Sequence, residues 1–238
     1  MPDHKQVYNR EAQNYQRLVA REDYHDNLLR SIQDIINPNN LDVVDLGAGT
    51  GRLACLLAPF ARSVYAFDLS PHMLSIASSR LIKKDLNRWL VAASDHRRVP
   101  LNASSADLVV SGWSFCYLVV WEEKNWKTAL EAGLQEINRL LREKGTIVII
   151  ESLGTGIKRP EPSEKLKEYF QYLEARGFHR TWLRTDYEFQ DMEEARELVQ
   201  FFFGEEMLEK INDEPRPVLP ECTGIWWTSK SHLSKIGK

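Results

Sequence analysis

Apolar side chains recur along the first forty positions at the spacing of amphipathic helices. Two stripes with three- and four-residue spacing are present, and they consist of Tyr8, Ala12, Tyr15, Leu18 and Val19, then Leu28, Leu29, Ile32, Ile35 and Ile36. The second stripe ends in Asn-Pro-Asn-Asn at 37–40, a cluster typical of a turn. We therefore predict an N-terminal helical cap over residues 1–40.

Short apolar runs alternate with helical stripes from position 41 to position 151. The runs predict strands at 41–46, 64–67, 89–93, 106–111 and 146–151. Helices are predicted at 52–61, after Ser70 as an N-cap with Pro71 in the first turn, and at 126–141. This alternation predicts an α/β fold with a doubly wound, mostly parallel sheet and helices on both faces.

The pattern changes after position 151. A loop with glycines and prolines leads to a predicted helix at 163–176, a strand at 178–189, a helix at 191–203 and a last strand at 224–229. We expect the two strands to be antiparallel end strands of the sheet. Residues 191–220 then form an insertion that packs on the core. The N-terminal helices and residues 152–177 are both placed to cover the carboxyl edge of the sheet, where ligands bind in such folds.

The composition of the chain disfavours several classes of protein. The 238 residues carry 31 basic and 34 acidic side chains, a formal charge of −3, with 43% hydrophobic and 27% charged residues. This balance gives no whole-chain reason to expect a nucleic acid or an anionic membrane as partner. The three cysteines are widely spaced, which disfavours a disulfide framework or a zinc site. No apolar run is long enough for a bilayer and the first residues are polar, so we expect a cytoplasmic protein.

The segment V-V-D-L-G-A-G-T-G-R at 43–52 carries most of the chemical information. A predicted strand runs into Gly47, Gly49 and Gly51, and a helix follows. Glycine there allows a tight turn and a close approach of the backbone to a ligand. A dinucleotide loop needs its third glycine at position 52, but Arg52 stands there. This departure argues against a nucleotide-dependent oxidoreductase.

The pattern D-x-G-x-G-x-G resembles the first motif of the class I, Rossmann-like, S-adenosylmethionine-dependent methyltransferases. Four further features follow in that family's order: Asp68 at the end of the second strand with Met73 behind it, Asp95 after the third strand with Pro100 five residues on, Asp107 at the start of the fourth strand, and a turn at 140–146 that departs from the family's pattern at Glu143 and Lys144. The resemblance covers residues 41–151. It implies a seven-stranded sheet with an antiparallel last strand, in one domain over residues 1–238.

The resemblance also implies a binding site for S-adenosyl-L-methionine. The residues that we predict to bind it are Tyr15, Gly47, Ala48, Gly49, Gly51, Asp68, Leu69, Met73, Asp95, His96 and Ser111. Asp45 and Asp107 are expected to be structural. Tyr15 and Arg21 resemble the aromatic and basic residues that N-terminal helices of this family lay over the cofactor. Simpler interpretations stay open: the glycines as a turn without ligand, Asp68 as a helix cap, Asp95 as a solvated loop residue, and Tyr15 and Arg21 as parts of an ordinary amphipathic helix.

The resemblance predicts methyl transfer to an oxygen, nitrogen or carbon nucleophile, and no metal. The sequence does not choose a catalytic base; the candidates by position are His96, Tyr117, Glu151, His179, Asp186 and Glu188. Trp113 and Tyr117 fit either the core or the site. We expect a small-molecule acceptor, no nucleic acid and a monomer or homodimer. An RNA or protein methyltransferase, or a non-catalytic S-adenosylmethionine-binding protein, are the alternatives.

Overall fold

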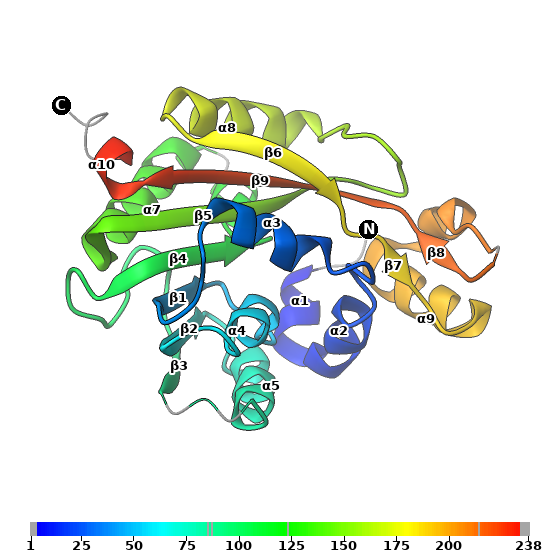
Figure 1. Ribbon diagram of the computed structural model, residues 1–238. Helices are drawn as coiled ribbons and strands as arrows, with labels where there is room; N and C mark the ends of the chain where they lie inside the picture. The colour runs from blue at the N-terminus through cyan, green and yellow to red at the C-terminus, as the bar shows by residue number, and fades with distance from the viewer. Residues whose placement is uncertain (1–3, 85, 87, 123, 214, 234–238) are drawn as a thin grey trace.

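The predicted apolar runs form a seven-stranded sheet in the computed structural model, which describes residues 4–84, 86, 88–122, 124–213 and 215–233 (Figure 1). The strand order is β3-β2-β1-β4-β5-β9-β6. The strands are β1 (Asp42–Leu46), β2 (Ser63–Asp68), β3 (Trp89–Ala93), β4 (Ala106–Gly112), β5 (Leu141–Thr155), β6 (His179–Arg184) and β9 (Glu221–Ser229). The seven strands agree with the number implied by the family resemblance.

Strand directions follow the prediction. β1 to β5 pair in parallel, and β9 lies antiparallel between β5 and β6. The predicted strand at 178–189 is wrong in one respect, because it breaks after β6. Its second part, β7 (Tyr187–Glu188), pairs with β8 (Val218–Leu219) in a separate two-stranded sheet. The break is held by Asp186, whose carboxylate accepts hydrogen bonds from the Glu221 N–H at 2.9 Å and from Nε and Nη2 of Arg184, each at 2.8 Å.

Successive side chains of the buried strands point to opposite faces of the sheet and build two cores. Val44, Ile147 and Trp226 pack on one face against α6 (Cys116–Val120), α7 (Trp126–Leu140) and α8 (Glu164–Ala175). Val43, Val148 and Ile225 pack on the other face against α3 (Asn27–Ile35), α4 (Arg52–Leu57) and α5 (Pro71–Ile82). The sheet is therefore doubly wound, as the alternation predicts.

The turn between α7 and β5 is anchored by an ion-pair network at the start of the parallel strands. Register jumps from Ala106↔Leu141 to Leu108↔Thr146, so residues 142–145 bulge out. Arg142 contacts the Asp107 and Asp42 carboxylates, each at 2.7 Å. Asp107 also accepts the Asp42 N–H at 2.9 Å. Asp107 thus has the structural role expected for it.

One of the two segments expected to cover the carboxyl edge of the sheet, residues 152–177, lies elsewhere. Helix α8 buries Tyr169, Phe170 and Leu173 in the core on the α7 side of the sheet. The helix packs on the sheet face because burying this stripe of large apolar side chains there removes apolar surface from water. Residues 152–177 therefore flank the sheet instead of capping its edge.

The N-terminal helices cover that edge, as predicted. Helices α1 (His4–Arg10) and α2 (Ala12–Val19) lie between α5 and the insertion (Figure 1). The insertion contains α9 (Met192–Phe203) and the 3-10 helix η1 (Glu205–Lys210), followed by β8. Leu18 joins Phe189, Leu198 and other insertion residues in a separate apolar cluster, and the Arg17 guanidinium contacts Glu197 at 2.5 and 2.8 Å. The cap and the insertion thus share a core of their own.

A short helix, α10 (Lys230–Leu233), follows β9 and packs back on β5. Within the part of the chain that the structure describes, no helix has the length and apolarity to cross a bilayer.

Trp226 tests the core between the sheet and α8. Its side chain is completely buried and stacks on Phe170, with ring centroids 4.4 Å apart. We expect Trp226→Leu to lower the free energy of unfolding by about 3 kcal/mol in urea titrations, because it leaves a cavity. Trp182→Leu, on an edge strand and 46% exposed, is the control and should change it by at most about 0.5 kcal/mol. Equal effects would contradict the packing of α8.

Candidate active site

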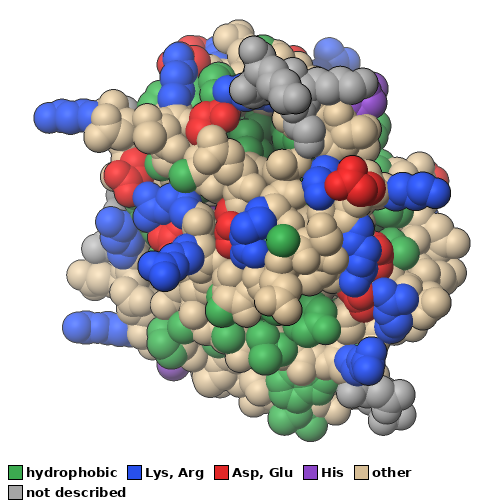
Figure 2. All heavy atoms as spheres, turned by 90° about the vertical axis from the view of Figure 1, so that its left-hand side faces the viewer, with side chains coloured by type: hydrophobic (Ala, Val, Ile, Leu, Met, Phe, Trp, Pro, Cys, Tyr) green, Lys and Arg blue, Asp and Glu red, His purple; other side chains and the backbone are tan. Residues whose placement is uncertain are grey.

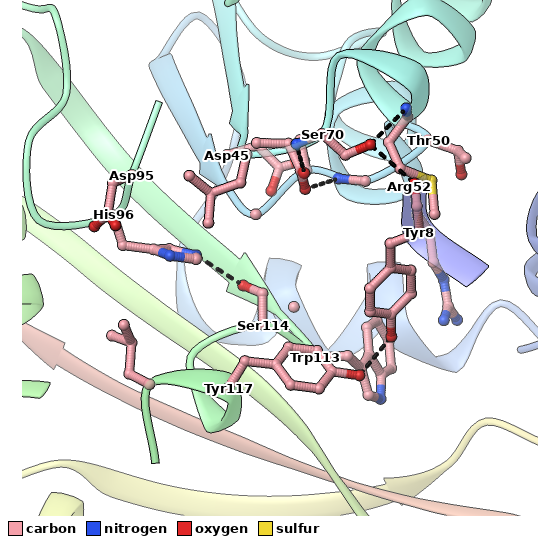
Figure 3. A pocket seen from close by; sticks show the side chains of 18 of the residues that line it. Tyr8, Asp45, Thr50, Arg52, Ser70, Asp95, His96, Trp113, Ser114 and Tyr117 are labelled. Atoms are coloured by element: carbon pink, nitrogen blue, oxygen red, sulfur yellow. Dashed lines mark hydrogen bonds between the residues drawn. The ribbon is translucent and has the colours of Figure 1, made fainter. Parts of the chain in front are cut away.

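A cavity of about 450 Å³ lies where β1, β2 and β4 end, beneath α1 and α2 (Figure 3). The loop after β1, the loop after β3 and the segment that leads into α6 line it from the sheet side. Tyr8, Asn9 and Tyr15 line it from the N-terminal helices. The carboxyl edge of the sheet, the N-terminal helices and α6 thus meet around one space.

The glycine loop forms the floor of this cavity. Gly47 and Gly49 adopt positive φ angles of 70° and 53°, which disfavour any side chain. The Gly47 and Ala48 N–H groups donate to the Phe67 carbonyl at 2.8 and 2.9 Å. A Cβ at position 47 would lie 2.3 Å from Ser114 Oγ and 2.9 Å from His96 Nε2. Glycine is therefore required at position 47 both for the conformation and for the close approach.

Two aspartates lie under and beside the loop. Asp68 accepts the N–H groups of Gly49 at 2.9 Å and Ser70 at 2.8 Å, and burial raises its pKa. Asp45 accepts the Ala54 N–H at 2.9 Å, and burial, with the Asp68 charge as a smaller cause, raises its pKa to about 7. Asp45 thus ties the loop to the first turn of α4, the structural role expected for it. Ser70 caps α5 by accepting the Met73 N–H, as predicted.

The loop after β3 provides the opposite rim. The Asp95 carboxylate is clamped by Arg97, through the backbone N–H at 2.8 Å and the guanidinium at 2.7 and 2.8 Å, and this lowers its pKa. His96 Nε2 lies 3.3 Å from Ser114 Oγ, and burial lowers the imidazole pKa to about 4. His96 is therefore neutral at pH 7.

Aromatic side chains close the cavity from above. The hydroxyls of Tyr8 and Tyr117 form a short hydrogen bond between α1 and α6. Tyr15 lies over the glycine loop, 3.9 Å from where a Cβ of residue 49 would be. Trp113, at the end of β4, has a positive φ of 50° and stacks under the Arg52 guanidinium, whose carbon is 4.1 Å from the ring centroid. Such strain in a non-glycine residue is common at functional sites.

Nine of the eleven predicted binding residues line the cavity: Tyr15, Gly47, Ala48, Gly49, Asp68, Leu69, Met73, Asp95 and His96. Their binding role stays a prediction. Two do not line it. Gly51 lies where a Cβ would approach Ala77 Cβ to 3.0 Å, so it permits the packing of α4 on α5. Ser111 is fully buried beneath the loop and donates to the Leu46 carbonyl at 3.0 Å.

Of the six candidates for a base, His96 and Tyr117 line the cavity. Glu151 is buried behind α6 and accepts the Cys116 N–H at 2.8 Å, and burial raises its pKa to about 7. The other three candidates, His179, Asp186 and Glu188, lie on or next to β6 and β7 and are not among the residues that line the cavity.

Several lining residues were not singled out from the sequence as site residues, namely Lys5, Tyr8, Asn9, Ser114, Leu118, Trp121 and Glu122. Those from 114 to 122 share one signal, because they follow the predicted fourth strand, whose carboxyl end faces the site in an open α/β sheet. Tyr8 and its neighbours had no such signal, since only the tertiary fold brings α1 to the loop. Arg21, expected to accompany Tyr15 over the cofactor, instead contacts Glu194 at 2.7 Å.

Comparisons with known proteins agree with this geometry. A family model described as a methyltransferase domain matches residues 44–149. A probable S-adenosylmethionine-dependent methyltransferase of Saccharomyces cerevisiae, CRG1, is 23% identical over 199 residues, covering 82% of this chain and 60% of that protein. An uncharacterized methyltransferase of Bacillus cereus is 25% identical over 158 residues, covering 66% of each chain. The crystal structure of an S-adenosylmethionine-dependent methyltransferase from Aquifex aeolicus has a TM-score of 0.54 at 16% identity, covering 94% of this chain and 93% of that one.

Residues 44–149 therefore match a methyltransferase domain, and the chain has the fold of the Aquifex aeolicus protein. S-adenosylmethionine is the cofactor named in the descriptions of the S. cerevisiae and A. aeolicus proteins. The match spans 60% and 66% of the lengths of the two curated relatives named above.

The cavity fits this cofactor on structural grounds. The missing Cβ atoms at Gly47 and Gly49 leave the loop backbone open to a ligand, with positive φ at both positions. Asp68 is a carboxylate at the end of β2, and the hydroxyl of Thr50 is buried without a hydrogen-bond partner among the described residues. Unpaired buried polar groups are uncommon in folded proteins, so a ligand atom or a water is expected to satisfy Thr50.

Gly47 tests the close approach of the loop to β4. Gly47→Ala should lower the free energy of unfolding by about 3 kcal/mol, because a strained φ adds to a clash with Ser114. Gly49→Ala has the same strain, but its Cβ would make only an ordinary van der Waals contact with Tyr15 at 3.9 Å, so it should cost about 1 kcal/mol. Urea unfolding of both variants measures the difference. Equal losses would show that the contact with Ser114 is unimportant.

His96 gives a pH test. Its pKa falls from 6.5 in the unfolded chain to about 4 in the fold, so its contribution to stability is complete above pH 6.5 and is lost as the pH falls towards 4. The melting temperature of the wild type relative to His96→Gln should therefore fall between pH 6.5 and 4. The exposed His72→Gln variant is the control and should show a flat difference. A flat difference for His96 as well would mean that it is not buried as a neutral group.

Proposed function

We propose that the chain catalyses S-adenosylmethionine-dependent methyl transfer to a small-molecule acceptor. The observation that carries this proposal is the convergence of nine predicted binding residues, from four separate segments of the chain, on one cavity. The match of residues 44–149 to a methyltransferase domain supports methyl transfer, and the cavity's size and charge favour a small acceptor over a polymer.

In this proposal the glycine loop, Asp68 and the loop after β3 hold the cofactor. When bound, S-adenosylmethionine supplies an activated methyl group, which the acceptor's lone pair takes as the carbon–sulfur bond breaks. The chain's contribution is to orient the acceptor and to exclude water. Tyr8 and Tyr15 suit the second task, because they bring α1 and α2 over the loop.

An acceptor that loses a proton needs a group to receive it. The His96 imidazole lines the cavity and is neutral at pH 7, so it is able to accept a proton. Its low pKa makes it a weak base, which suits an acceptor that is already nucleophilic or acidic. Glu151 does not line the cavity, and we propose that it acts only by holding α6.

The charges support a small acceptor. The lining residues include three basic side chains, Lys5, Arg52 and Arg97, and four acidic ones, Asp45, Asp68, Asp95 and Glu122. Figure 2 shows the face on the opposite side from the cavity, where the parallel strands begin; basic side chains are more frequent there than acidic ones, and Arg62 and Arg142, which belong to this end of the sheet, both pair with Asp42. RNA binding relies on clustered, unpaired positive charge near the site.

Calorimetry tests the cofactor site. We expect S-adenosylmethionine to bind the wild type in the micromolar range, about −8 kcal/mol. Asp68→Ala should weaken binding at least about tenfold, because it removes a buried carboxylate from the cavity and releases the Gly49 and Ser70 N–H groups. Asp34→Ala, exposed on α3, is the matched control. Equal binding by wild type and Asp68→Ala would overturn the site assignment.

The acceptor class is then separated by incubating the chain with methyl-labelled cofactor and either a metabolite pool or an RNA and protein pool. Label in small molecules supports the proposal. Label only in RNA or protein would identify a macromolecular methyltransferase, and binding without any transfer would favour a non-catalytic role.

A further inference from the structure

Four aromatic rings form a continuous wall along the cavity, which we call the aromatic wall: Tyr15, Tyr8, Tyr117 and Trp121. Tyr8 meets Tyr15 and Tyr117 edge to face, with ring centroids 5.4 and 5.7 Å apart. Tyr117 stacks on Trp121 at 4.3 Å with an interplanar angle of 22°. The wall thus runs from the glycine loop to the mouth of the cavity.

The hydroxyls of Tyr8 and Tyr117 are paired by a hydrogen bond within the wall (Figure 3). When one phenol donates to the other, one hydroxyl hydrogen is left over, and the pair keeps oxygen lone pairs to accept. Burial raises the pKa of both phenols well above 10, so both stay protonated at neutral pH. The wall therefore offers a neutral hydrogen bond and no negative charge.

Both tyrosines are fixed from behind. The Tyr8 carbonyl accepts from Ser70 Oγ at 2.9 Å, which ties α1 to the start of α5. The Glu151 carboxylate accepts the Cys116 N–H at 2.8 Å and the Tyr169 hydroxyl at 3.2 Å, which holds the first turn of α6. The hydroxyl pair is thus preorganised from two segments 109 positions apart in the chain.

The predicted cofactor-binding residues lie mostly on the side of the cavity opposite the aromatic wall, so the wall is available to contact the acceptor. Eight of the nine predicted binding residues along the cavity belong to the loops after β1, β2 and β3 and to α5; only Tyr15 belongs to the wall. Trp121, at the far end of the wall, is 40% exposed. An exposed indole at the mouth of a cavity is typical of a ligand-contact surface.

We propose that the acceptor is a planar aromatic small molecule with a hydroxyl group, which stacks on the aromatic wall and hydrogen-bonds to the Tyr8–Tyr117 pair. This inference rests on the proposed function and names its substrate class. Flat rings gain offset or edge-to-face contacts with such a wall that a saturated ring of the same size does not gain. Tyr8 and Tyr117 are then specificity-determining residues.

A matched pair of probes tests the class: 2-naphthol and its saturated analogue decahydro-2-naphthol, each titrated by calorimetry into the chain saturated with S-adenosylhomocysteine. We expect 2-naphthol to bind at least about tenfold more tightly. Tyr117→Phe and Tyr8→Phe should each weaken 2-naphthol about fivefold, the effect of one neutral hydrogen bond. Trp121→Leu should reduce the preference for 2-naphthol about fivefold, which corresponds to one lost aromatic contact.

Two variants outside the cavity serve as controls. Tyr172→Phe removes a hydroxyl that contacts Glu131 and Arg176 on the α8 side, and Trp182→Leu removes an exposed indole on the edge strand β6. Neither should change the affinity for either probe. Both tyrosine variants keep their rings, so melting temperatures near the wild type are expected.

The outcomes separate this inference from the proposed function. If S-adenosylhomocysteine and S-adenosylmethionine do not bind, the proposed function fails and the inference fails with it. If they bind but both probes bind equally, or the preference survives all three wall variants, the inference is overturned while the cofactor site stands. Methyl transfer to RNA alone, with no binding of 2-naphthol, would overturn it as well.

Discussion

The close packing of the glycine loop against the end of β4 is the constraint on which the rest of the site depends. The Leu46 carbonyl accepts the hydroxyls of Ser111 and Ser114 at 3.0 and 2.9 Å, and Gly47 leaves no room for a side chain between the loop and Ser114. This contact fixes the floor of the cavity and the direction in which the chain leaves β4. Trp113 takes up the strain of that turn, and α6 begins where the turn ends.

The N-terminal helices and the insertion pack together as one unit, and this unit closes the cavity. The N-terminal helices and the insertion share an apolar cluster, and the ion pairs of Arg17 with Glu197 and of Arg21 with Glu194 lie at its edge. The Arg52–Glu22 ion pair joins this unit to the first residue of α4. Glu22 also accepts from Thr185 at 3.0 Å, next to the break between β6 and β7. The acceptor side of the cavity therefore depends on residues from both ends of the chain.

The features predicted well from sequence are local or repeat along the chain. Short apolar runs predicted β1 to β5, since a strand buried on both faces has apolar side chains at consecutive positions. The Ser70 cap and Pro71 predicted the start of α5. The glycine pattern and the acids after it predicted the cavity's floor. Two predicted residues, Gly51 and Ser111, lie outside the cavity. A shift of one position along a loop or strand is enough to point a group away from the cavity and into the packed interior.

The sequence by itself determined which residues face the sheet core and which loop lines the cavity, because both follow from side-chain periodicity and from the steric freedom of glycine. Only the tertiary structure decided which of the two expected segments covers the site. Residues 152–177 and the N-terminal helices are both amphipathic, and periodicity gives no preference for one surface over another. Helix α8 packs on the open sheet face, and α1 and α2 pack against α5 and the insertion. These packing contacts determine which segment lies over the site. They also bring Tyr8 to Tyr117, a contact between distant segments that no local pattern encodes.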